Sequence, residues 1–336
     1  MFVRRELIIE LTIVVALGLC AGSCCERRTS GEPGWQLDAS NTGLAAVGLS
    51  CDDLAVYEGP SEPAAGTTLR ELRITTALDL SAGNITIERC CIQPTAVGQG
   101  MPILTTTDYN QAPYPPASTM VSVRDCDIDG SLIHGEHTMV DGYDEYNKPV
   151  AFTCAFLGIG EIERCNIHDV GSGIAIYNTG DHLNAVVEGN YVHDLRAWGD
   201  PSTTGSHNES FTIRDFVVTS AHPHRSATVR NNRFESFSGN DTGAFFIQTN
   251  GDIDHVLVEG NLLASNGYQL ILESRYDHVY GTSMKSRNNR FSGTGFGTGY
   301  VEPAGLTYGW AVWKENYIDD PAAPDHKGAV VEDPSP

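Results

Sequence analysis

A short pattern built around one asparagine recurs along the second half of this sequence, and it limits what the chain can fold into. Each copy places a strand residue, two polar or glycine residues and the asparagine in the same order, with an apolar residue two positions later. The last three intervals between these asparagines are 29, 28 and 27 residues. Short strands recurring at that length are typical of the coils of a parallel β-helix. The aligned residues are Asn190, Asn232, Asn261, Asn289 and Asn316.

Three earlier copies of the pattern carry a cysteine in place of the asparagine: Cys90, Cys126 and Cys165. An asparagine in a tight turn can bond to the same group in the coils above and below, whereas a cysteine row would be small, buried and weakly polar. Neighbouring strands lie about 4.8 Å apart, within the Cα separation that a disulfide tolerates. The sequence therefore leaves open a vertical Cys90–Cys126 or Cys126–Cys165 disulfide, or a row of buried thiols.

A second strand follows the asparagine in four successive coils, at 173–178, 210–215, 244–249 and 269–274. Apolar residues alternate along each of these segments, so one set of side chains must point into the core and the other outward. The alternation buries Ile174, Ile176, Phe211, Ile213, Phe245, Ile247, Leu270 and Leu272, and it places Tyr177, Arg214, Gln248 and Glu273 in one outward column.

These patterns predict an all-β chain, a single-stranded right-handed parallel β-helix of about 8–10 coils over residues 46–320. The LxxLxLxxN spacing of leucine-rich repeats does not occur, a propeller needs longer repeats, and a sandwich would not repeat one asparagine at the same corner. Residues 25–45 are interpreted as a tether, and the Pro-rich stretch 321–336 as a disordered tail.

The first 24 residues are typical of a targeting segment. A basic start precedes an apolar run at 11–22 that is too short to span a bilayer as a mature helix. The run ends in small residues before Cys24, which resembles the lipobox of bacterial lipoproteins, in which that cysteine is lipidated. We therefore expect export and an anchor in the cell envelope, with plain secretion as the alternative.

The charge and composition of the chain limit the kinds of molecule that it is expected to bind. The formal net charge of -22 would repel the phosphates of a nucleic acid, while 40% apolar and 19% charged residues describe a folded domain. We expect a monomer that binds a polysaccharide and touches the membrane only through its N-terminal anchor. No CxxC pair occurs, which argues against a zinc site.

The coil sequences resemble bacterial secreted parallel β-helix proteins of the pectate-lyase-like superfamily, over about residues 50–318. The resemblance is carried by "PAAGTTL", "NITIERC", "IERCNIHDVGSGIAI" and "HNESFTIR". It implies the fold, and a function among polysaccharide lyases, glycosidases, epimerases, esterases and non-catalytic adhesins. Glu209 and Ser210 stand where that group has Asp-Gly, and Ser172 stands in another Asp position. The RxPxxR signature of pectate lyases and the polygalacturonase motifs do not occur.

The coil from Asn190 to Asn232 is the longest of the regular series, at 42 residues, and its extra length flanks the strand 210–215. Long excursions from a solenoid are commonly used to build a site. The first excursion carries Trp198, a candidate stacking platform, and the second carries Arg225.

The column and its flanks suit β-elimination on a uronate polymer, in which a cation neutralises the carboxylate and a base removes the C5 proton. Candidate catalytic residues are His207, Arg214, Tyr177 and Arg225, and candidate substrate-binding residues are Gln248, Glu273, Arg275, Trp198 and Asn178. Glu209 and Glu273 could hold a cation, for which Ca²⁺ is the candidate, or act as the carboxylate pair of a glycoside hydrolase. A non-catalytic surface protein that binds glycans is the third reading. His168 and His193, at equivalent positions of successive coils, are interpreted as stacked turn residues.

Overall fold

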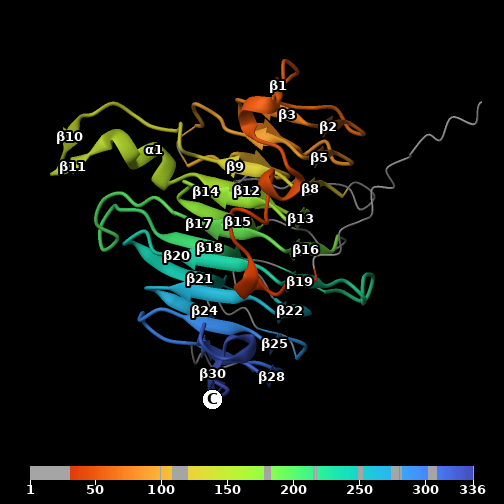
Figure 1. Cartoon of the computed structure of the whole chain (residues 1–336), viewed down its shortest axis with the longest axis vertical. Helices are drawn as coiled ribbons and strands as arrows, with labels where there is room; N and C mark the ends of the chain where they lie inside the picture. Colours follow the sequence, from red (N-terminus) through yellow and green to blue (C-terminus); the bar gives the residue numbers. More distant parts are fainter. Residues whose placement is uncertain are drawn as a thin grey trace, which may run out of the picture.

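Three parallel sheets wind around one core in the computed structural model (Figure 1). The predicted all-β parallel β-helix is thus confirmed, and the successive strands of each sheet come from successive coils. Three predicted positions, Cys24, Asn178 and Arg275, lie outside the described residues. The structure describes residues 31–98, 100–107, 120–177, 183–214, 216, 218–248, 253–273, 280, 282–301 and 309–335.

Sheet B precedes the corner that carries the asparagine pattern, and sheet A follows it. Sheet B consists of β2 (Thr68–Arg70), β5 (Thr86–Glu88), β8 (Ser122–Arg124), β13 (Glu161–Glu163), β16 (Ala185–Glu188), β19 (Ala227–Arg230), β22 (Val256–Glu259), β25 (Lys285–Arg287) and β28 (Val312–Lys314). Sheet A consists of β1 (Ala55–Val56), β3 (Leu72–Ile74), β6 (Cys91–Ile92), β9 (Asp127–Asp129), β14 (Asn166–His168), β17 (Tyr191–His193), β20 (Arg233–Ser236), β23 (Leu262–Ser265), β26 (Arg290–Ser292), β29 (Tyr317–Asp319) and β30 (Lys327–Val330).

Sheet C closes each coil and carries the longest strands. It consists of β4 (Leu78–Asp79), β7 (Leu104–Thr105), β12 (Cys154–Gly158), β15 (Ser172–Ile176), β18 (Asn208–Ile213), β21 (Asp241–Gln248), β24 (Tyr268–Glu273) and β27 (Tyr300–Val301). An insertion between β9 and β12 projects from the stack and contains β10 (Met139–Val140), β11 (Tyr143–Asp144), the 3-10 turn η4 (Glu145–Asn147) and the short helix α1 (Lys148–Ala151) (Figure 1).

The predicted asparagine ladder forms at the corner between sheets B and A. Asn261 is fully buried, and its Oδ1 accepts bonds from the backbone N–H and the Nδ2 of Asn232 at 2.9 and 3.0 Å. Its own Nδ2 donates to Asn289 Oδ1 at 3.0 Å, and the same arrangement repeats from Asn190 to Asn316. Each ladder residue therefore satisfies the buried polar groups of its neighbour, as the repeat predicts.

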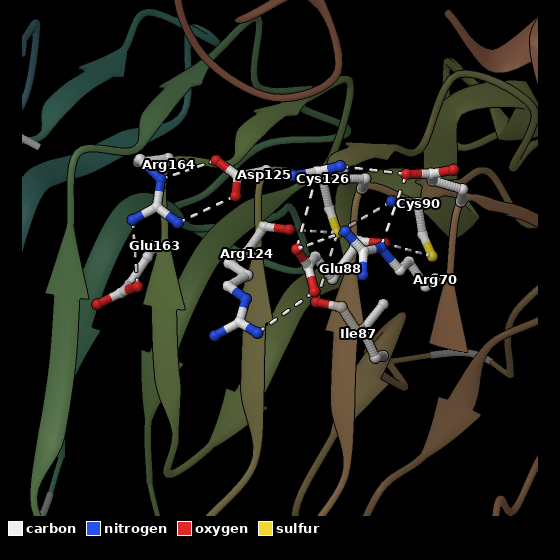
Figure 2. Close-up of polar contacts among 11 residues, drawn as sticks. Arg70, Ile87, Glu88, Cys90, Arg124, Asp125, Cys126, Glu163 and Arg164 are labelled. Carbon is white, nitrogen blue, oxygen red and sulfur yellow. Dashed lines mark hydrogen bonds and ion pairs between the residues drawn. The ribbon is translucent and has the colours of Figure 1, made fainter. Parts of the chain in front are cut away.

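The cysteines continue this ladder as free, buried thiols, so neither vertical disulfide is formed. The Cys90 backbone N–H donates to Cys126 Sγ at 3.3 Å, which takes the place of the bond to an asparagine oxygen. A different pair among the described residues, Cys51 and Cys91, forms a disulfide. Figure 2 shows Cys90 and Cys126 of this ladder together with the charged residues around them.

Charged side chains line the outer surface of this corner in two columns (Figure 2). One column runs through sheet B, where Glu88 pairs in register with Arg124 and their side chains lie 3.3 Å apart. The other lies at the turn itself, where Arg164 makes two bonds to the Asp125 carboxylate at 2.7 and 3.0 Å. Arg164 and Asp125 both adopt a positive φ, which bends the chain sharply from sheet B into sheet A.

The chain ends differ from the expected tether and disordered tail. Residues 31–48 run along the outside of the stack, where Gly34 N–H donates to Gly260 O and Gly43 N–H to Arg164 O, both at 2.8 Å. A Cβ on Gly34 would lie 2.0 Å from the Asn232 carbonyl oxygen, so only glycine allows this close approach. At the other end, β30 pairs antiparallel with β29 and closes the last coil. No helix among the described residues is long and apolar enough to span a membrane.

Candidate functional site

The outer face of sheet C has the predicted register. Ile174, Phe211, Phe245 and Leu270 pair in successive strands and all lie in the core, as the alternation predicts. Gln248 pairs with Glu273, and the preceding pairs bring Tyr177 and Arg214 into the same row. The four side chains of the predicted column therefore belong to adjacent strands of one sheet face.

Three members of this column form a hydrogen-bonded chain. Arg214 Nη1 donates to Gln248 Oε1, and Gln248 Nε2 donates to Glu273 Oε2. The Arg214 guanidinium lies 5.3 Å from the centre of the Phe246 ring, and its Nη2 is 4.0 Å from Glu209 Oε1. The ring, the amide and the carboxylate together fix the position of the guanidinium. Its side chain keeps 28% exposure, so part of the charge still faces solvent.

Glu209 lies at the start of β18, where the register shifts relative to β21. Its side chain is buried, and Ser172 Oγ donates to its Oε2 at 3.3 Å. Burial raises the pKa of this carboxyl group, and the opposing effects of Arg214 and a bond from Thr242 offset only part of that rise. The ordinary cause of such a shift is that a charged carboxylate loses its hydration in a buried position.

His207 is exposed directly before β18, and its Nδ1 lies 3.5 Å from Thr242 Oγ1. Because Thr242 also bonds to Glu209, the imidazole is at the edge of the same cluster. Of the predicted residues, the structure brings together His207, Glu209, Arg214, Gln248 and Glu273. We call these five residues the sheet C cluster.

Arg225 does not join this cluster. It is buried next to sheet B, where its Nε donates to Leu183 O at 2.5 Å and its guanidinium lies 3.8 Å from the centre of the Phe216 ring. Its contacts hold a corner of the solenoid together. Tyr177 lies beside Arg214 in the row and is half-buried, and its catalytic role stays a prediction.

Trp198 joins two neighbouring insertions. Its Nε1 donates to Asp144 O at 2.9 Å, the Lys148 ammonium lies 4.3 Å from its ring centre, and its ring packs against Tyr143 and Phe152. The excursion 194–207 is therefore supported by the insertion 131–152, a contact between side chains distant in sequence. Its role as a sugar platform stays a prediction.

Cys154 and Ser172 are neighbours of the cluster that the sequence did not mark as functional. They pair in register at the starts of β12 and β15, and Ser172 reaches Glu209. Burial raises the pKa of the Cys154 thiol to about 12, which keeps it protonated and unsuited to act as a nucleophile. Only the pairing of strand starts, which sequence periodicity does not fix, reveals this proximity.

The described residues do not fit the predicted cation site. Arg214 and Gln248 stand between Glu209 and Glu273, and a guanidinium beside one carboxylate opposes a bound cation. A different cluster, Asp129, His168 and Asp169, has possible ligand atoms within 4.8 Å of one another. Its carboxylates already bond to other side chains, including Arg196 on Asp169, so it forms an ion-pair network.

The comparisons give this chain no relative. No family model, no curated protein and no solved structure matches it.

Proposed function

We propose that this chain cleaves a uronate-containing extracellular polysaccharide by β-elimination at the sheet C cluster. The observation that carries the proposal is that the fixed, partly exposed guanidinium of Arg214 and the exposed imidazole of His207 both act on the buried carboxyl group of Glu209. Polysaccharide lyases are among the functions that the pectate-lyase-like resemblance of the coil sequences implies. The Cys51–Cys91 disulfide supports export, with lipidation at Cys24 as part of the proposal, because disulfides persist in oxidising compartments.

Arg214 supplies the charge that elimination requires. A planar guanidinium can bind a carboxylate through two parallel hydrogen bonds, and the negative charge of the uronate grows as its C5 proton leaves. Gln248 and Phe246 hold the guanidinium in place before substrate arrives, so little ordering remains to be done on binding.

His207 is the proposed base. Its neutral imidazole takes the C5 proton, the electron pair forms the C4–C5 double bond, and the bond from C4 to the glycosidic oxygen breaks. The imidazolium then returns the proton to the departing oxygen, so one chain ends in an unsaturated uronate and the enzyme is unchanged. Glu209 is buried and acts through its contact with Arg214 as a positioning residue.

Glycoside hydrolysis is the second candidate, because a carboxyl group with a raised pKa is suited to act as a general acid. Hydrolysis also needs a second carboxylate across the bond that is cleaved. Arg214 and Gln248 occupy the space between Glu209 and Glu273, and this order favours elimination.

The test is a screen of uronate polymers, namely alginate, pectate and glycosaminoglycans, for the ultraviolet absorbance of the unsaturated product. The wild-type protein should form that product from at least one polymer, and His207→Ala should reduce the rate by about 100-fold or more. Absence of product from every polymer, with binding retained, would leave the protein a glycan-binding module. Full activity in His207→Ala would remove the imidazole from the mechanism.

A further inference from the structure

A pocket of about 210 Å³ lies away from the sheet C cluster, at the corner where sheet A ends and sheet C begins. The insertion 131–152 forms one wall, and turns of the solenoid after β9, β14 and β17 form the other. At about 30 Å³ per water molecule, this volume equals about seven waters, enough for one small ring and too little for a chain. The polar residues that line it are Ser131, His134, Tyr146, Asn147, Asp169 and Arg196.

The insertion wall is a stack of three rings. Tyr146 lies between His134, with ring centres 4.6 Å apart, and His137, at 4.1 Å and almost parallel. Asp144 fixes the stack, because its carboxylate bonds to His137 Nδ1 at 2.9 Å and accepts from the Tyr146 backbone N–H at 3.0 Å. The two histidines cover both faces of the Tyr146 ring, so the outer face of His134, an exposed residue that lines the pocket, is the ring surface left for the C–H face of a sugar.

The solenoid wall carries two side chains of opposite charge, Asp169 and Arg196, that form an ion pair. Arg196 donates through Nε to Asp169 Oδ1 at 2.7 Å, and His168 Nδ1 lies 2.8 Å from the other oxygen of that carboxylate. The Arg196 side chain is 50% exposed, so its guanidinium has N–H groups that can donate to a ligand. Because the pair is internally neutralised, it favours hydroxyl groups, which both donate and accept, over a free carboxylate or phosphate.

We infer that this pocket binds a single neutral hexopyranose unit, with its ring face against the aromatic wall and its hydroxyls against the Asp169–Arg196 pair. This site is separate from the proposed elimination and does not depend on it. The excursion 194–207 links the two, because Arg196 near its start lines the pocket and His207 at its end belongs to the sheet C cluster.

Saturation-transfer NMR with the methyl glycosides of glucose, galactose and mannose tests the inference on the full folded chain, with methyl glucuronide as the charged comparison. At least one neutral glycoside should bind, and Tyr146→Leu and Arg196→Leu should each weaken its binding by about tenfold or more. Lys285→Ala, an exposed change on sheet B, is the control and should bind as wild type does.

Tyr146→Leu could lose binding merely because the ring stack unfolds, so Asn147→Lys serves as a second pocket variant. Asn147 is exposed, and a longer side chain there fills the pocket without removing a ring. Loss of binding in Asn147→Lys with an unchanged melting temperature supports the inference. Binding of no neutral glycoside, preference for the glucuronide, or equal binding by the pocket variants and Lys285→Ala would each overturn it.

Discussion

Replacing Asn261 with alanine should destabilise the solenoid strongly, because the residue sits in the middle of the buried ladder. The change removes the oxygen that accepts both the backbone N–H and the Nδ2–H of Asn232, at 2.9 and 3.0 Å. Each buried donor left without a partner costs about 1–3 kcal/mol, so the two together predict a loss of about 2–6 kcal/mol. That is a large share of the usual 5–15 kcal/mol free energy of unfolding, taken as an order of magnitude.

Asn261→Cys is the matched variant, since the chain itself uses cysteine in this position of other coils. The Cys126 sulfur accepts a backbone N–H at 3.3 Å, so a thiol at position 261 can satisfy the backbone N–H of Asn232. Only one Nδ2–H of Asn232 then lacks a partner, because the other donates to Val187 O at 2.9 Å. The predicted loss for the cysteine variant is therefore smaller than for the alanine variant, by about 1–3 kcal/mol.

Urea unfolding followed by far-ultraviolet circular dichroism measures both losses, with the slope m compared to confirm that the same surface is exposed. An alanine variant that loses less than about 1 kcal/mol would refute the reasoning, because the ladder bonds would then contribute little. A cysteine variant as unstable as the alanine variant would refute the view that the thiols continue the ladder.

Three further predictions concern the site and the chain ends. Burial raises the pKa of Glu209, so the protonated carboxyl group stabilises the fold below its ordinary pKa, and this stability is lost as the pH rises through the raised value. Glu209→Gln, which stays neutral, should therefore have a higher melting temperature than wild type at neutral pH. A difference in melting temperature that does not shrink toward acidic pH would contradict this prediction. Arg214→Lys should slow product formation by about tenfold or more while leaving the melting temperature nearly unchanged, because an ammonium cannot bind a carboxylate through two parallel bonds; steady-state kinetics on the polymer identified by the screen checks this. Cys51→Ser should lower the free energy of unfolding by up to about 4 kcal/mol, because the disulfide closes a loop with a sequence separation of 40; an unchanged denaturation midpoint would contradict it.

The solenoid itself could be predicted from the sequence because its two strongest signals are local. The asparagine repeat fixes one corner of every coil, and alternation in the following strand fixes which side chains enter the core. The path of residues 31–48 could not be predicted, since it depends on glycines such as Gly34 that contact the backbone of coils some 200 residues away. The closing strand β30 follows a Pro-rich stretch whose composition alone is typical of a disordered tail.

The part of the candidate site that lies on the strands of sheet C could also be predicted from the sequence. Strand register placed Arg214, Gln248 and Glu273 in one row, and the structure joins them by hydrogen bonds. The positions of side chains on the two excursions were harder to predict from the sequence, because the direction of such a side chain depends on what packs against it. Arg225 is buried and donates a hydrogen bond to the Leu183 carbonyl oxygen. Trp198 packs against an insertion that the repeat pattern does not reveal.

The most direct test of the proposed elimination is mass spectrometry of the products formed from the active uronate polymer in water labelled with heavy oxygen. Elimination adds no water, so the account predicts unsaturated oligosaccharides without the label, and loss of those products in His207→Ala. Saturated products that carry the label would show hydrolysis and contradict the account.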